Sequence, residues 1–196
     1  MEKLRDYISF DLEFNEHQDK THLIQVSAVR FKDGEEVGAF DSYVHTDVPL
    51  KSFINGLTGI TSETLKDAPM VEEVLKNFQD FVGELPLVGY NAAKSDLPIL
   101  LEYGLDYSRQ YLVDLYDEAF ERRSSDLHGI ANLKLQTVAE FLGFKGQSHN
   151  SLEDARMTAR VYEAFLESDE SRVLLDSKSS LNSNPFGGLD LSQFFD

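Results

Sequence analysis

The sequence predicts an α/β fold in which a mixed five-stranded sheet is flanked by helices. In the first third of the 196-residue chain, three segments of β-type residues are separated by turn residues, which is typical of an antiparallel meander. In the remainder, short apolar strands alternate with segments of helical period, which adds parallel strands covered by helices. The hydrophobic fraction of 41% is sufficient for a packed core.

Three strands form the predicted meander. Residues 7–14 alternate β-type residues with acids, and residues 22–31 make a second strand that is polar in the middle of one face. Asp33 and Gly34 predict a tight turn. Residues 39–45 then return as the third strand.

Helices and strands alternate in the later part of the chain. The helical period is clearest in residues 71–82, where apolar residues recur at spacings of three and four. A short helical turn at 62–66 precedes this helix, with Ser62 as its expected N-cap. The remaining predicted elements are strands at 85–90 and 111–114 and helices at 97–103, 115–122, 135–142 and 152–166.

The chain divides into a predicted domain at 1–167 and a disordered, acidic tail at 168–196. From Ser168 onward the periodic pattern is lost, and the segment is rich in Ser and contains an Asn-Pro and a Gly-Gly pair. Residues 189–195 are nevertheless more apolar than a solubilising tail requires. This apolar end predicts a binding partner for the tail.

The composition excludes several classes of protein. The chain has no Cys, which excludes a disulfide scaffold, a thiolate zinc site and a Cys nucleophile. The lack of Cys fits a reducing compartment. No signal peptide is apparent and no apolar run approaches the ~18 residues of a membrane span, so we expect a cytoplasmic protein with no membrane partner. A net charge of -17, from 35 acids and 18 bases, by itself argues against a nucleic-acid partner.

Two carboxylates at the end of the first predicted strand are the first candidate site residues. Asp11 and Glu13 are separated by one residue, so their side chains lie on the same face of a strand. Their neighbours Phe10, Leu12 and Phe14 are apolar. Two like charges this close beside a core are unfavourable unless a cation lies between them, although a solvated edge strand would carry the same pattern.

The second candidate motif precedes the last predicted helix. Asn150 or Ser151 can cap this helix, which leaves His149 in the preceding loop and Asp154 about one turn into the helix. The helix macrodipole alone also favours an acid at Asp154. Glu153 lies about 100° around the helix from Asp154, so only one of these two acids can face a site.

The third candidate motif lies where a buried strand leads into a helix. Asp96 stands at the start of that helix, beside Ser95 and Pro98, which both favour a helix N-terminus. Asp96 is therefore either a capping residue or a third site carboxylate. Asp114, at the end of the next strand, is the alternative to it.

Together the three motifs closely resemble the DEDDh family of 3′–5′ exonucleases, which includes the ε subunit of bacterial DNA polymerase III and ribonuclease T. The shared order is a strand with Asp-x-Glu, a strand leading to a helix with Asp, and His-x4-Asp at a late helix, over roughly residues 5–166. The second motif differs: Tyr90 and Ser95 replace the usual His and Phe, and one extra residue separates Asn91 from Asp96. The resemblance implies a ribonuclease H-like fold.

The resemblance implies a metal-dependent 3′–5′ exonuclease, a hydrolase that cleaves phosphodiester bonds at 3′ ends of DNA or RNA and releases nucleoside monophosphates. In the implied two-metal mechanism, Asp11 bridges both ions, Glu13 and Asp154 complete one shell, and Asp96 supports the other ion through water. Oxygen ligands without Cys favour Mg²⁺ or Mn²⁺. His149 would accept the proton of the attacking water, because imidazole titrates near neutral pH.

The resemblance also implies which residues contact the terminal nucleotide. These are Leu57, Thr58 and Ile60, together with Phe14, which replaces the usual Thr and would act as a stacking or wedge residue. Core packing is the alternative role for Leu57 and Ile60. The expected substrates are single-stranded or frayed 3′ ends of DNA or RNA.

Two other functions remain open at the level of the sequence. The altered second motif would suit an exonuclease-fold module that binds nucleic acid or a partner with weakened catalysis, although all four carboxylates and His149 are present. Alternatively, the acids bind a cation that only stabilises the fold. In the tail, Ser192-Gln193-Phe194-Phe195 resembles the short peptides that dock on sliding clamps, which indicates a replication or repair protein as partner.

Overall fold

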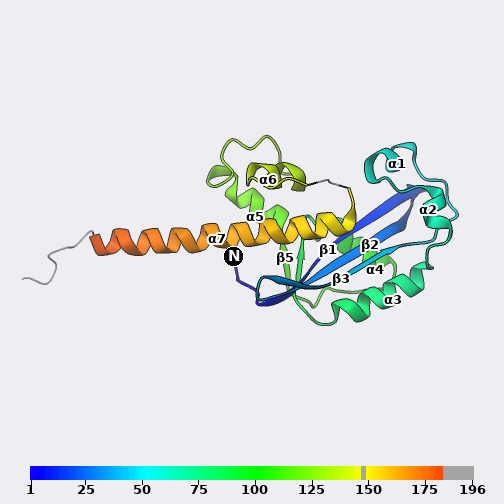
Figure 1. Cartoon of the computed structure of the whole chain (residues 1–196), viewed down its shortest axis with the longest axis horizontal. Coiled ribbons are helices and arrows are strands. Elements are labelled where there is room, and N and C mark those ends of the chain that lie inside the picture. The colour runs from blue at the N-terminus through cyan, green and yellow to red at the C-terminus, as the bar shows by residue number, and fades with distance from the viewer. Residues whose placement is uncertain (147–148, 183–196) are drawn as a thin grey trace, which may run out of the picture.

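The computed structural model describes residues 1–146 and 149–182, with side chains as far as residue 175 (Figure 1). Five strands form one sheet in the order β3-β2-β1-β4-β5. The three N-terminal strands pair antiparallel, and β4 and β5 add parallel strands beside β1. The predicted fold class is therefore confirmed. The strands are β1 (Asp6–His17), β2 (Lys20–Lys32), β3 (Glu35–Tyr43), β4 (Leu87–Gly89) and β5 (Leu112–Asp114).

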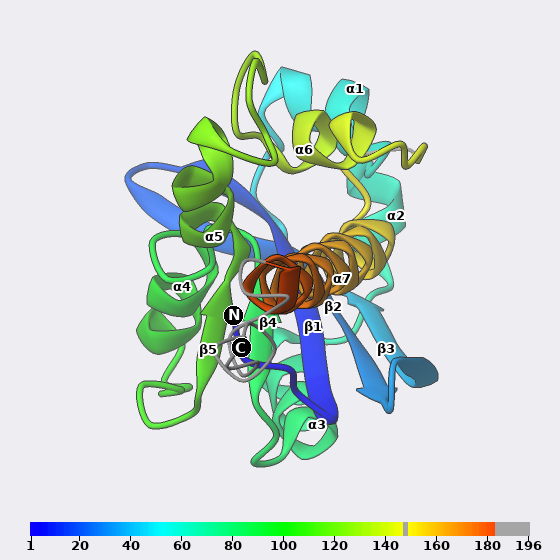
Figure 2. The ribbon, with the colours of Figure 1, turned by 90° about the vertical axis from the view of Figure 1, so that its left-hand side faces the viewer.

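Helices cover both faces of the sheet, with α7 on one side and α3 on the other (Figure 2). Among the described residues, none of the helices is both long enough and apolar enough to cross a membrane. The helices are α1 (Ser52–Thr58), α2 (Ser62–Lys66), α3 (Val71–Val82), α4 (Asp96–Glu102), α5 (Leu115–Glu121), the short 3-10 helix η1 (Arg122–Ser124), α6 (Leu135–Phe141) and α7 (Ser151–Asn182).

The side chains of β1 alternate between two hydrophobic cores, one on each face of the sheet. Tyr7 packs in the core beneath α5, α6 and α7, whereas Ile8, Phe10 and Leu12 pack in the core beneath α3 and α4. Ser9 also faces α7, because its Oγ donates to the backbone oxygen of Ala155 at 2.7 Å. Since side chains alternate along a strand, Asp11 and Glu13 lie on the α7 face of the sheet.

The last helix is longer than its sequence pattern predicts. We expected ordered structure to end near residue 167, but α7 continues to Asn182. The apolar period ends earlier because α7 there leaves the sheet, as Figure 1 shows, and its contacts become ionic. Asp169 binds the Met1 ammonium at 3.1 Å and Arg122 at 2.7 Å. Residues 183–196, which include the apolar end and the clamp-like tetrapeptide, lie outside the described residues.

Candidate active site

The edge of β1 is open where its two acids lie. Only Ile8 and Ser9 pair with β4, so the strand continues past the end of its parallel neighbour. Asp96, at the start of α4, lies at this open edge: its Oδ1 accepts the backbone N–H of Leu12 at 3.1 Å. The side chain of Asp96 is buried, with 6% exposure. The structure therefore brings the third carboxylate to the backbone of the residue between Asp11 and Glu13.

The second motif lies at the start of α7, on the same face of the sheet as Asp11 and Glu13. His149 has a left-handed backbone, with φ of 70°, and its backbone N–H donates to Asp154 Oδ2 at 2.8 Å. Asn150 caps the helix, because its Oδ1 accepts the N–H of Glu153 at 3.2 Å. The tight turn at His149 thus places the imidazole and the Asp154 carboxylate next to each other.

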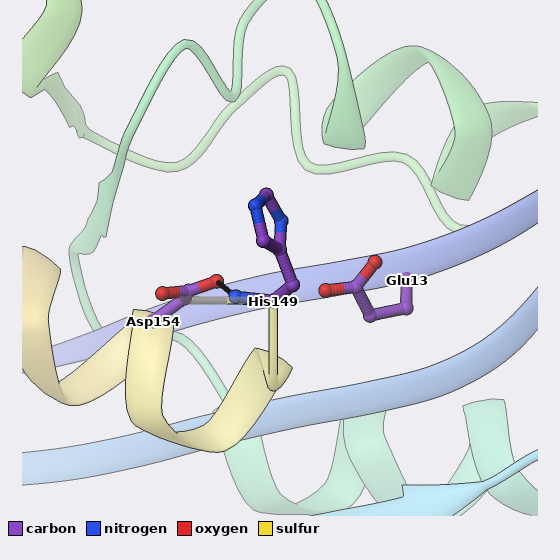
Figure 3. A group of neighbouring side chains, drawn as sticks. All are labelled: Glu13, His149 and Asp154. Carbon is purple, nitrogen blue, oxygen red and sulfur yellow. Dashed lines mark hydrogen bonds between the residues drawn. The ribbon is translucent and has the colours of Figure 1, made fainter. Parts of the chain in front are cut away.

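Three of the predicted site residues form a compact donor group. One ligand atom from each of Glu13, His149 and Asp154 lies within 4.8 Å of the other two. Figure 3 shows the imidazole of His149 between the two carboxylates, with the hydrogen bond from the His149 backbone to Asp154. These side chains come from β1 and from the beginning of α7, which are more than 130 residues apart along the chain.

The carboxylates of this region raise one another's pKa. Burial raises the pKa of Asp11 well above its usual range, and the charges of Asp96, Asp154 and Glu13 raise it further. Burial, followed by the charges of Asp154 and Asp96, raises the pKa of Glu13 to about 7. All four predicted carboxylates therefore belong to one electrostatic cluster.

Asp96 and Asp154 also receive hydrogen bonds that oppose the effect of burial. Burial raises the pKa of Asp96 to about 7, although hydrogen bonds from Ser95 and the Leu12 backbone lower it. Burial also raises the pKa of Asp154, and the backbone N–H of His149 opposes this increase. These donors satisfy part of the negative charge, but no basic side chain contributes to the shifts of Asp11, Glu13 or Asp96.

This donor set fits a hard divalent cation. Half-buried or buried carboxylates that repel one another are stabilised when a metal ion lies between them. Carboxylate oxygens with a single imidazole, and no thiolate in the chain, suit Mg²⁺ or Mn²⁺ better than soft metals. Glu13, His149 and Asp154 are thus chemically able to hold such an ion, and the roles of Asp11 and Asp96 as ligands stay a prediction.

A layer of buried polar side chains supports the start of α7, and the sequence motifs did not identify it. Ser27 pairs with Asp11 across β1 and β2. Its Oγ lies 2.5 Å from Ser151 Oγ and 2.7 Å from Asp41 Oδ1. Gln25, the cross-strand partner of Glu13, also donates to Asp41. The polar middle of the second predicted strand was the available signal for this layer.

The altered second motif is accommodated by a turn at Asn91, which has a left-handed backbone with φ of 58°. Tyr90, which stands for the family's His, donates its hydroxyl to the backbone oxygen of Leu133 at 2.7 Å. The extra residue is absorbed before α4, so Asp96 still reaches β1. Asp114, the alternative carboxylate, instead accepts backbone N–H groups of this loop.

The residues predicted to contact the terminal nucleotide divide between surface and core. Leu57 is 44% exposed, whereas Ile60 is 2% exposed and packs in a small core with Ile24, Ile54 and Leu65. Thr58 Oγ1 donates to the backbone oxygen of Ile54 at 2.9 Å and accepts the Ile60 N–H at 3.0 Å. Phe14 is half-buried and packs against the core beneath α3. Leu57 is therefore the member of the set best placed to meet a ligand.

Helix α1 and its contact with β1 were not predicted from the sequence. Phe53, one turn before Leu57, is 58% exposed and shares its side of the helix. The buried side chain of Asn15 holds the start of this segment, because Oδ1 accepts the Lys51 N–H at 3.0 Å and Nδ2 donates to the Pro49 oxygen at 3.2 Å. The exposed apolar side of α1 is thus fixed to the strand that carries Glu13.

Known proteins resemble this chain over the segment that contains the candidate site. A family model described as Exonuclease, RNase_T, matches residues 8–162, which include all five predicted catalytic residues. DNA polymerase III PolC-type of Caldanaerobacter subterraneus subsp. tengcongensis is 31% identical over 184 residues, covering 91% of this chain and 13% of that protein. DNA polymerase III subunit epsilon of Aquifex aeolicus is 28% identical over 173 residues, covering 84% of this chain and 85% of that protein. The chain therefore spans only a small part of the PolC-type relative.

Solved structures share the architecture. The nuclease domain of 3′hExo, a DEDDh family member bound to rAMP, superposes with a TM-score of 0.65 at 21% identity, over 84% of this chain and 92% of that chain. E. coli Exonuclease I in complex with a dT13 oligonucleotide gives a TM-score of 0.69 at 17% identity, over 89% of this chain and 43% of that chain. The likeness at these identities concerns the fold, and the predicted ribonuclease H-like architecture is confirmed.

Proposed function

Because the chain belongs to the exonuclease family that the RNase_T model describes, we propose that it hydrolyses phosphodiester bonds at the 3′ ends of nucleic acids and releases nucleoside monophosphates. The main support for this proposal is that ligand atoms of Glu13, His149 and Asp154 lie close together at the open edge of β1. Asp11 and Asp96 belong to the same electrostatic cluster. An acidic cluster with one imidazole is suited to metal-dependent hydrolysis.

Four carboxylates would hold the metal ions. Asp11, Glu13, Asp96 and Asp154 offer oxygen ligands for two Mg²⁺ or Mn²⁺ ions, and their mutual repulsion favours cation binding. Bound divalent ions stabilise the negative charge that develops on the phosphodiester oxygens during displacement. Among the carboxylates, Asp96 is further oriented by its hydrogen bond from the Leu12 backbone.

His149 would act as the general base. Its imidazole lies between Glu13 and Asp154 (Figure 3), and its backbone is held by the hydrogen bond to Asp154. A ring nitrogen in this position can accept a proton from a water molecule that attacks the terminal phosphodiester.

Single-stranded or frayed 3′ ends are the proposed substrates. The solved relatives named above bind rAMP and a dT13 oligonucleotide, so either DNA or RNA is chemically compatible with this fold. Leu57 and Phe53 offer apolar surface on which a base can stack. Because the chain has a net charge of -17, we propose that metal ions and this end-binding surface provide most of the affinity. Few phosphate contacts and a shallow salt dependence would follow.

Polymerase association is the proposed cellular context. Two of its relatives are a polymerase III PolC-type protein and a polymerase III epsilon subunit, so we propose that this chain acts on 3′ ends presented by a polymerase. The proposed domain at 1–167 would carry the chemistry, and residues 168–196 would contact the partner. A pull-down with and without residues 182–196 tests the tail.

The direct test is nucleotide release from a single-stranded oligomer labelled at its 3′ end, with Mg²⁺ or Mn²⁺. We expect the wild type to release nucleoside monophosphates and Asp11→Ala to release none. Asp80→Asn is the matched control, because Asp80 is an exposed acid on α3 that pairs with Lys76. Binding of the oligomer without cleavage would instead support a module with weakened catalysis.

A further inference from the structure

We propose that Asp114 is a positioning residue that holds the loop between β4 and α4, so that Asp96 is fixed at the metal site. This inference rests on the proposed function and assigns a role to a carboxylate outside the predicted ligand set. Asp114 would not touch a metal ion or the substrate. It would act through the backbone of the loop that carries Asp96.

Three backbone N–H groups converge on the Asp114 carboxylate. Oδ1 accepts the N–H of Asn91 at 2.8 Å and the N–H of Tyr116 at 3.0 Å. Oδ2 accepts the N–H of Ala93 at 2.9 Å. Asp114 pairs with Gly89 at the last position of the β4–β5 ladder. The carboxylate therefore lies next to the point where the chain leaves β4.

The loop that Asp114 holds is tightly folded. The backbone oxygen of Asn91 accepts the N–H groups of Lys94 and Ser95 at 3.2 and 3.0 Å, and the oxygen of Ala92 accepts the N–H of Leu97 at 2.9 Å. A Cβ added to Gly89 would lie 2.4 Å from the Cβ of Ala92, so the loop packs directly on β4. A displacement at Asn91 would thus be transmitted to the start of α4.

Asp96, the site carboxylate, directly follows this loop as the first residue of α4. Asp96 accepts the N–H of Leu12 at 3.1 Å. Hydrogen bonds consequently link the end of β5, the loop at 91–95, the start of α4 and the backbone of β1 between Asp11 and Glu13. Asn91 has a left-handed backbone, a conformation that Asn adopts more readily than most residues, and the two bonds to Asp114 hold the loop in this conformation.

Helix capping alone does not explain Asp114. A cap on α5 needs only the hydrogen bond to Tyr116, and Ser provides such a bond as well as Asp does. The two additional bonds go to Asn91 and Ala93, which are more than 20 residues earlier in the chain. Asp114→Ser keeps the capping function but is too short to hold both loop N–H groups. It therefore separates capping from positioning.

Asp114→Ser and Asp114→Asn, together with a control, test the inference in the full chain. Asp114→Asn retains Oδ1 but presents an amide donor to the Ala93 N–H. Asp106→Asn is the control, because Asp106 also accepts a backbone N–H, that of Ser108 at 2.8 Å, before β5 begins. The measurements are the melting temperature in EDTA, the Mn²⁺ concentration that gives half-maximal thermal stabilisation, kcat and KM on the oligomer, and amide hydrogen exchange.

We expect Asp114→Ser to melt within about 4 °C of the wild type in EDTA, while its half-maximal Mn²⁺ concentration rises about 10-fold or more. The kcat should fall about 10- to 100-fold, with KM changed less than about threefold. Asp106→Asn should match the wild type. Unchanged Mn²⁺ midpoint and kcat in Asp114→Ser would overturn the inference and leave Asp114 as a helix cap.

Hydrogen exchange keeps the test decisive if Asp114→Ser folds poorly. In Asp114→Asn the Ala93 amide should exchange about 10-fold faster than in the wild type without metal, and an unchanged rate overturns the inference. The measurements also distinguish a failure of the positioning role of Asp114 from a failure of the proposed exonuclease activity. If the wild type releases no nucleotide but the Mn²⁺ midpoint still shifts in both variants, positioning by Asp114 stands and the proposed activity fails.

Discussion

Asp96→Asn should make the metal-free protein more stable while it weakens metal binding. Asp96 is buried and its pKa is raised to about 7 from the ordinary 3.8, mainly by burial. Asn has nearly the same shape and retains the Oδ1 that accepts the Leu12 N–H. The substitution therefore removes a buried negative charge without removing its hydrogen bond to β1.

The magnitude follows from the pKa difference between the folded and unfolded states. The folded-state pKa lies above the unfolded value, so folding stability falls as pH rises from about 4 to about 7 and the full penalty applies above that. At about 1.36 kcal/mol for each pKa unit, the upper limit is about 4 kcal/mol. Because the neighbouring acids titrate together with Asp96, we expect a gain of about 2–4 kcal/mol in Asp96→Asn at pH 8.

Thermal and chemical denaturation in EDTA at pH 8 measure this gain. A gain of this size corresponds to an increase of roughly 5–10 °C in melting temperature for a protein of this length. The difference in melting temperature between Asp96→Asn and the wild type should become smaller as pH is lowered to 5. Mn²⁺ should stabilise the wild type more than the variant. Asp80→Asn, at an exposed position on α3, should not differ from the wild type. If Asp96→Asn melts below the wild type in EDTA at pH 8, the electrostatic reasoning is refuted.

Three further predictions concern stability and substrate binding. In EDTA the wild-type melting temperature should fall as pH rises from about 4 to about 7 and level off above that, because burial raises the pKa of Glu13 and of Asp96 to about 7 and ionisation of these carboxyls favours the unfolded state. A melting temperature that rises over this pH range would contradict the prediction. Ser151→Ala should lower the free energy of unfolding by about 1 kcal/mol in urea denaturation, because it removes a buried hydrogen bond. Ile60→Ala should cost about 2–4 kcal/mol, since its side chain is fully packed, whereas Leu57→Ala should leave stability within about 1 kcal/mol and raise KM for the oligomer.

Local spacing was sufficient to predict how the residues within each motif lie relative to one another. Asp11 and Glu13 share a face because strand side chains alternate. Asn150 is typical of a helix N-cap, and an acid four residues later, Asp154, lies close enough to the N-terminus of the helix to accept the backbone N–H of His149. These relations depend only on the geometry of one strand or one helical turn. They are therefore visible in the sequence before any tertiary structure is known.

Contacts between distant segments could not be predicted in the same way. The bonds of Asp114 to Asn91 and Ala93 depend on β4–β5 register, and the Ser27–Ser151 contact depends on where α7 crosses β2. No periodicity in the sequence encodes either relation. Both were established only by the packing of complete elements.

The missed helical segments have a similar cause. Helix α1 has only 7 residues, which is too short for a helical period to be recognised in the sequence. The continuation of α7 beyond residue 167 is held by ion pairs, of Asp169 with Met1 and Arg122 and of Lys3 with Glu170. Hydrophobic periodicity does not report contacts of this kind.

Product analysis on a single-stranded oligomer labelled within the chain is the most direct test of the central claim. The wild type with Mn²⁺ should shorten the strand one nucleotide at a time from its 3′ end and release nucleoside monophosphates, while His149→Ala should lower kcat about 10²–10⁴-fold. The His149 variant should remain folded, as judged by circular dichroism. Internal cleavage, release from the 5′ end, or no release from folded wild-type protein with Mg²⁺ or Mn²⁺ would contradict a 3′–5′ exonuclease site at the open edge of β1.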